Sequence, residues 1–182
     1  SGTALSGTPA DAAQASANAG QAVILNGTGL STTTDVLLRY VDTNGTLQMV
    51  RLSPSSAAVD GSSATVVIPA YANGAFTLQV FGSSSQPLLQ IVPTLTGFDI
   101  QDRTVLFGSG FVEGASSYSF AGASVTDTPA DASAIDVYFT VNFSSENGSA
   151  YLNRSALPAH GLGNVVFSTA GGTSAPLALN AI

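Results

Sequence analysis

Cysteine, tryptophan and lysine do not occur in this 182-residue chain, and histidine occurs once, at His160. Without cysteine, disulfides, thiolate nucleophiles and cysteine-ligated metal sites are excluded. A single imidazole excludes the histidine-rich sites that bind zinc. Serine is plentiful, so composition alone leaves a Ser-His-Asp triad open, but no Gly-x-Ser-x-Gly turn exposes a nucleophile. We therefore expect no enzymatic activity and no cofactor.

Charge is also scarce: charged residues make up 8% of the chain, against roughly 25% in an ordinary globular protein. The four cations are all arginines, and the net charge is −7. Nucleic-acid binding needs clustered Lys and Arg to neutralise phosphates, so that class of partner is excluded. No apolar run approaches the roughly 18 residues that a membrane span needs, so we expect no membrane insertion. The acidity serves solubility.

Short segments rich in β-branched and aromatic residues recur after Gly20, bounded by Gly, Asn, Asp, Ser or Pro. Such spacing is typical of an all-β sandwich or barrel. The clearest hairpin signal is Asn44-Gly45, flanked by alternating apolar residues, because that turn needs positive φ. The expected strands are 22–25, 35–41, 46–52, 64–68, 75–81, 88–92, 104–107, 117–120, 135–143, 150–152, 165–168 and 176–179.

An internal repeat divides the chain. Residues 23–30 align with residues 104–111 at an offset of 81, which places Leu30 on Phe111. Farther along, the offset is 89, which places Leu78 on Phe167. The difference indicates an insertion in the second copy, between residues 115 and 150. We predict a sandwich over 20–90, a second over 91–182, and the two lying end to end.

Residues 1–19 hold a single large apolar side chain, Leu5, in an Ala-rich stretch. Alanine favours helix, so a short helix over 10–19 is one alternative. Without an apolar stripe, nothing would hold such a helix to a core. The segment is predicted to be a flexible leader or linker.

Several motifs of the two copies resemble the IPT/TIG family of immunoglobulin-like domains. They are Gly27-Thr28-Gly29-Leu30 and Gly108-Ser109-Gly110-Phe111 after a strand, Ile91-Val92-Pro93 at the entry of copy two, Val66-Val67-Ile68-Pro69, and the strand from Gly74 to Val80. The resemblance covers residues 20–182. It implies two tandem immunoglobulin-like β-sandwiches. Copy two departs from the pattern at 153–158, where no regular apolar strand precedes the proline.

Calcium is the one metal that the sequence leaves open, because it needs only oxygen ligands. Asp99 and Asp102 stand near the start of copy two, and Asp127 and Asp131 flank the insertion. Their spacing matches no EF-hand loop, so solvated turn carboxylates are the alternative. These four aspartates are the candidate Ca²⁺ ligands.

Stacked sandwiches with so little charge suit a spacer, so we predict a non-catalytic stalk module of a large surface or adhesin-type protein, outside the cell. Neighbouring repeats of the same polypeptide would then be its first partners. Three alternatives remain: a module that binds carbohydrate or a protein receptor, an accessory domain of a secreted enzyme, and a sheet edge that takes up a partner strand.

Overall fold

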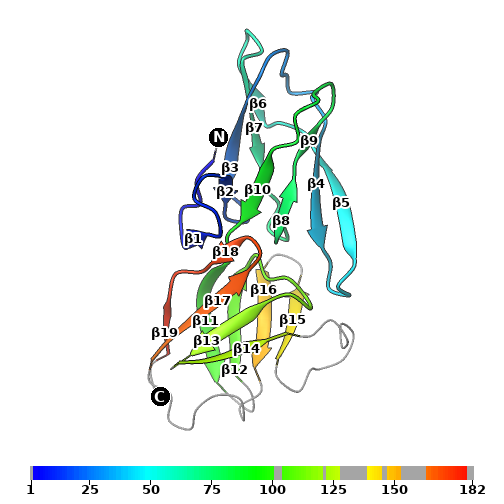
Figure 1. The fold of residues 1–182 in the computed structure, drawn as a ribbon. Coiled ribbons are helices and arrows are strands. Elements are labelled where there is room, and N and C mark those ends of the chain that lie inside the picture. The colour runs from blue at the N-terminus through cyan, green and yellow to red at the C-terminus, as the bar shows by residue number, and fades with distance from the viewer. Residues whose placement is uncertain are drawn as a thin grey trace.

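The computed structural model describes residues 2–100, 104–120, 122–127, 139–144, 147–152 and 163–179. Every regular element in these residues is a β-strand, so the all-β prediction is confirmed. None of the described segments forms a helix able to cross a membrane. Figure 1 shows the strands in two groups that follow one another along the long axis. We call them the N-terminal part (residues 2–92) and the C-terminal part (residues 93–179).

The N-terminal part holds ten strands. They are β1 (Thr8–Pro9), β2 (Ala15–Ala17), β3 (Ala22–Asn26), β4 (Val36–Val41), β5 (Leu47–Leu52), β6 (Ser56–Ala57), β7 (Ser63–Val67), β8 (Ala75–Thr77), β9 (Gln79–Val80) and β10 (Leu88–Ile91). One sheet has the order β3-β7-β6, and two further sheets have the orders β2-β10-β8 and β5-β4-β9. Leu78 alone separates β8 from β9, so one nearly continuous segment joins the last two sheets.

In the residues that the structure describes, the C-terminal part holds nine strands. They are β11 (Thr94–Ile100), β12 (Thr104–Ser109), β13 (Ser117–Phe120), β14 (Ala123–Thr126), β15 (Phe139–Ser144), β16 (Asn147–Leu152), β17 (Gly163–Thr169), β18 (Gly172–Thr173) and β19 (Leu177–Leu179). One sheet has the order β11-β12-β16-β15, and the other has β1-β18-β17-β13-β14 with β19 also on β17.

The pairing pattern recurs in the two parts. The set β3-β7-β6 corresponds to β12-β16-β15, and the pairs β4–β5 and β4–β9 correspond to β13–β14 and β13–β17. Each part has its own core, because alternate residues along each strand point inward. Val36 and Leu38 belong to one buried cluster, and Phe111 and Phe167 belong to the other. The aligned residues Leu78 and Phe167 are both buried in their respective clusters.

The predicted hairpin is confirmed: β4 and β5 pair from Val36↔Leu52 to Val41↔Leu47. Gly45 has a φ of 72°, which glycine adopts without steric cost. The Asp42 carboxylate accepts hydrogen bonds from the N–H groups of Asn44 and Thr46 and from the Gln48 amide. These bonds stabilise the charged carboxylate within the turn.

The hairpin is expected to weaken in acid. The bond from the Thr46 N–H, followed by that from Gln48, lowers the pKa of Asp42 below its ordinary value. A lowered pKa contributes stability above the pKa of the unfolded chain, and that stability is lost as the pH falls through the folded pKa. We expect the NMR shift of the Thr46 amide to follow this titration. Asp42→Asn should abolish the acid transition, and its persistence in that variant would contradict the assignment.

Candidate functional site

The segment predicted as a flexible leader contains two short strands, β1 and β2. Residues 15–17 of β2 run parallel to β10, and Thr8 and Pro9 of β1 pair with Thr173 and Gly172 of β18. Ala17 is completely buried. The segment therefore pairs with both parts of the chain. Together with the turns around residues 73 and 171, it forms what we call the junction.

Asn18 fastens the segment to the N-terminal part. Its Oδ1 accepts hydrogen bonds from the N–H groups of Leu5 (2.8 Å) and Ser6 (2.9 Å). Its Nδ2 donates to the carbonyl oxygens of Ser6 and Val92, each at 2.9 Å. All four hydrogen-bonding positions of this buried amide are thus used.

The Gln90 side chain, in the middle of β10, makes a second connection to the N-terminal segment. It is 1% exposed. Its Oε1 accepts from the Asp11 N–H at 2.7 Å, and its Nε2 donates to the Asp11 carbonyl at 2.8 Å. The amide therefore binds the backbone of residue 11 as a neighbouring strand would, and it positions β1 for pairing with β18.

Asn73 links the two parts directly. Its Nδ2 donates to the carbonyl oxygens of Val41 and Phe111, each at 2.8 Å, and its Oδ1 accepts from the Val41 N–H at 2.9 Å. The side chain is fully buried. A buried amide held in three directions fixes the chain at Phe111 relative to β4.

The turn at Gly171 and Gly172 brings the backbones of the two parts together. A Cβ on Gly171 would overlap the carbonyl oxygen of Ile91 and lie 2.7 Å from that of Gly74. Gly172 has a φ of 136°, and a Cβ there would overlap the carbonyl oxygen of Thr8. Only residues without a side chain allow this approach.

Among the described residues, the Asn73 amide and the backbone pairs of β1 with β18 link the two parts, and both are neutral groups. None of these groups titrates near neutral pH, and none is an ion pair that salt would screen. Neither salt nor a change of pH near neutrality is therefore expected to weaken these bonds.

Replacing Asn18 by alanine is expected to release the start of the chain. The N–H groups of Leu5 and Ser6 and the carbonyl of Val92 would lose their partner, at a cost of about 2 kcal/mol of unfolding free energy. Amide exchange at Leu5 and Ser6 should accelerate. The matched control is Gln14→Ala, because the exposed Gln14 side chain makes no hydrogen bond to any residue that the structure describes. Equal exchange in both variants would contradict the role of Asn18.

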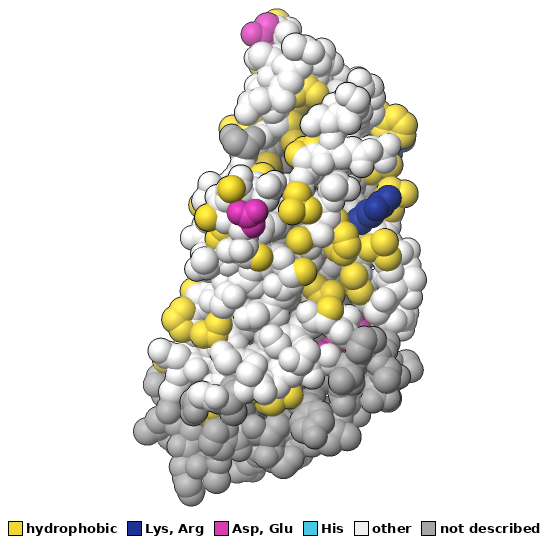
Figure 2. Space-filling view, viewed as in Figure 1, with side chains coloured by type: hydrophobic (Ala, Val, Ile, Leu, Met, Phe, Trp, Pro, Cys, Tyr) yellow, Lys and Arg dark blue, Asp and Glu magenta, His cyan; other side chains and the backbone are white. Residues whose placement is uncertain are grey.

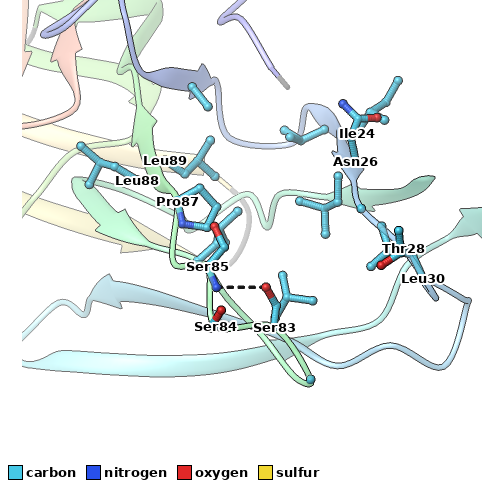
Figure 3. A pocket seen from close by; sticks show the side chains of 17 residues that line it. Ile24, Asn26, Thr28, Leu30, Ser83, Ser84, Ser85, Pro87, Leu88 and Leu89 are labelled. Atoms are coloured by element: carbon cyan, nitrogen blue, oxygen red, sulfur yellow. Dashed lines mark hydrogen bonds between the residues drawn. The ribbon is translucent and has the colours of Figure 1, made fainter. Parts of the chain in front are cut away.

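A pocket of about 640 Å³ opens in the N-terminal part. Figure 3 shows two walls, one from β3 and the residues after it and the other from the segment before β10. Its lining includes Val23, Leu25, Leu78, Val80 and Leu89, with Asn26, Thr28, Ser83, Ser84 and Ser85 among its polar members. No charged and no aromatic side chain lines it.

Leu30 is a lining residue of the pocket that can be compared with its counterpart in the C-terminal part. It aligns with Phe111 and packs on Gly27 as Phe111 packs on Gly108. Phe111 is completely buried, whereas Leu30 is half-buried and lines the pocket. Leu30 thus stands beside open space in the N-terminal part, whereas its counterpart Phe111 is enclosed in the C-terminal part.

Leu30→Phe is accordingly expected to stabilise the chain by about 1 kcal/mol, as cavity-filling substitutions do. Urea unfolding measures the change. Val67→Phe is the control, because Val67 is 49% exposed and does not line the pocket. A loss of stability in Leu30→Phe would show that the pocket does not admit the larger ring.

The candidate calcium ligands are not brought together where the structure describes them. Asp99 is exposed on β11, whereas Asp127 is buried after β14, in the other sheet, and its Oδ2 accepts from the Gly114 N–H. Asp102 and Asp131 lie outside the described residues, as does His160. Within the described ranges, no three acidic or histidine side chains form a group suited to a metal ion. A calcium site stays a prediction.

A comparison of the chain with models of known protein families gives no match. A comparison with curated proteins gives none either. Arguments about function therefore rest on the geometry.

The junction residues were missed at the level of sequence. The dipeptide Asn73-Gly74 is typical of an exposed turn, and no sequence pattern indicates that the Asn18 or Gln90 side chain is buried. The one available signal was Gly171-Gly172, a pair of adjacent glycines between two expected strands. Such a pair indicates a tight turn or a close backbone approach.

Proposed function

We propose that the chain is a pair of tandem immunoglobulin-like modules of the IPT/TIG type that acts as a non-catalytic spacer in a surface or secreted protein. The recurrence of the strand pairings in the two parts supports a duplicated module. The parallel pairing of β2 with β10, beside antiparallel β10–β8, supports an immunoglobulin-like order within the first module.

The junction is the observation that carries the spacer role. A spacer must hold its modules in line, and a flexible connection would let the distal module fold back. Here the N-terminal segment pairs with both parts, and Asn73 bonds from one part to the backbone of the other. Two independent connections restrain both bending and twisting. Because the bonding groups are neutral, the relative orientation of the two parts stays the same across the pH and salt conditions outside a cell.

Small-angle scattering tests this role. We expect the profile of a rod about twice as long as it is wide, because a compact module of roughly 90 residues has a radius of gyration near 13 Å. The profile should not change between low and high salt. A compact globular profile, or one that depends on salt, would count against a spacer.

The pocket favours a second candidate, a module that binds a neutral ligand. Its volume falls within the range of small-molecule sites. Because no aromatic ring lines it, it offers no stacking platform for a sugar. Loss of ligand binding in Leu30→Phe would favour this candidate, whereas a spacer keeps its function in that variant.

A further inference from the structure

The outer face of the sheet β9-β4-β5 is unusually apolar for an exposed surface. Val36 and Leu38 point into the core, so Leu37, Arg39 and Val41 lie on the opposite side of β4. Their cross-strand partners share that side: Arg51 is opposite Leu37, Met49 is opposite Arg39, and Leu47 is opposite Val41.

Two of these side chains are largely open to solvent, with Leu47 53% exposed and Met49 57% exposed. Phe81, just after β9, is 60% exposed, and its N–H donates to the carbonyl of Asp35 beside β4. Several exposed apolar side chains on one face of a sheet are typical of an interaction site. Figure 2 shows a cationic side chain among apolar ones on the side where Figure 1 places β4 and β5.

The same face carries two of the four cations in a chain whose net charge is −7. Arg51 is ion-paired with Asp35, its Nε lying 2.7 Å from the carboxylate. Arg39 is exposed, and among the residues that the structure describes it has no ion-pair partner. Its charge is therefore available to an anionic group of a partner.

The edge of this sheet is also open, because β5 is the end strand of the order β5-β4-β9. The Asp42 N–H donates to the Thr46 carbonyl, and hydrogen-bonded pairs alternate along an antiparallel ladder. The N–H and C=O groups of Leu47, Met49 and Arg51 consequently point away from β4. The strand Leu47–Leu52 contains no proline or lysine, the residues that commonly protect an edge.

We propose that β5 and the outer face beside it form a docking surface for an extended segment of a partner protein, added as a further strand, with apolar side chains and one carboxylate on its outer face. Backbone bonds to Leu47, Met49 and Arg51 supply the pairing. Neighbouring strands lie about 4.8 Å apart, so a glutamate opposite Met49 reaches Arg39 across the Met49 side chain. The exposed Arg39 favours a segment that carries a carboxylate at this position.

Two blocked nonapeptides serve as probes. In the first peptide, valine and threonine alternate, and glutamate replaces the central valine. The second peptide is identical except that glutamine replaces the central valine. In an NMR titration, we expect both to shift the amides of Leu47, Met49 and Arg51. The acidic peptide should bind about two- to fivefold tighter, the range of an exposed ion pair. In Arg39→Gln that preference should vanish.

Met49→Pro tests the strand addition itself. The Met49 N–H makes no hydrogen bond to β4, so a proline at this position is compatible with the fold. The proline also removes the N–H that a partner strand would bind at the outer edge. We expect at least about tenfold weaker binding of both peptides, since a central backbone bond is lost and the ring obstructs pairing. Val59→Ser, which removes a fully exposed apolar side chain outside this face, should bind as the parent chain does.

Three results would overturn the proposal: no binding of either peptide at millimolar concentration, shifts centred on β3 rather than β5, or equal affinities of the two peptides for the parent chain. Sedimentation velocity measures whether the chain associates with a second copy of itself. A dimer of the parent chain that Met49→Pro dissociates would assign the face to a second copy and overturn the acidic partner. If Met49→Pro does not fold, the Arg39→Gln comparison and the amide shifts still decide.

Discussion

Phe111→Ala is expected to lower the free energy of unfolding by about 3–5 kcal/mol, the usual cost of deleting a buried aromatic ring. The Phe111 side chain is completely buried, and its ring centroid lies 4.2 Å from that of Phe167. The ring also covers Gly108, where no Cβ intervenes. Truncation removes the apolar contacts and leaves a cavity at the centre of the C-terminal cluster.

Urea unfolding followed by circular dichroism measures this effect, and Phe107→Ala is the matched control. Phe107 lies on β12, four residues earlier, and is 40% exposed. Its removal should cost about 1 kcal/mol or less, because less apolar surface leaves water. Equal losses in the two variants would show that Phe111 does not hold the core together.

The second large effect is expected for Gly171→Ala. A methyl group there overlaps the Ile91 carbonyl and crowds that of Gly74, both of which are backbone atoms that cannot rotate away. Moreover, the Ile91 N–H donates to the Gly74 carbonyl at 2.8 Å, so the two residues move only together. We expect a loss of about 3 kcal/mol, at the upper end of overpacking effects, together with opening of the junction.

Gly97→Ala is the control for this substitution. A Cβ at Gly97 meets only the Phe107 ring, at 3.9 Å, and its φ is not in the left-handed region. Thermal unfolding and amide exchange at Ala10, whose N–H donates to the Gly171 carbonyl, report the two consequences. Unchanged exchange at Ala10 in Gly171→Ala would contradict the close packing of the junction.

The sequence was sufficient for elements that local rules determine. The hairpin at Asn44-Gly45 follows from turn chemistry, and the buried residues of β4 and β17 follow from alternation. The aligned residues Leu78 and Phe167 are both buried, each in its own cluster. The sandwich boundaries over 20–90 and 91–182 stay a prediction, although Ile91 packs with the first cluster.

Elements held by long-range polar contacts were not predictable in this way. β1 and β2 are two and three residues long, and they carry no apolar stripe. Buried amides at Asn18 and Gln90 hold them, and no local pattern distinguishes a buried amide from an exposed one. The strand β11 was not predicted. The register of its pairing with β12 shifts between Leu95 and Gly97, so the apolar residues of Thr-Leu-Thr-Gly do not alternate as in a regular strand.

The central claim is that the junction fixes the two parts relative to each other. Because the chain has no cysteine, Ser62→Cys and Ser124→Cys introduce two unique labelling sites, both exposed and one in each part. The distance between spin labels at these two sites, measured by pulsed electron paramagnetic resonance, tests the claim most directly. We predict a single narrow distance distribution that is the same at low and high salt and that broadens in Gly171→Ala. A broad or two-peaked distribution in the parent chain would contradict a rigid spacer.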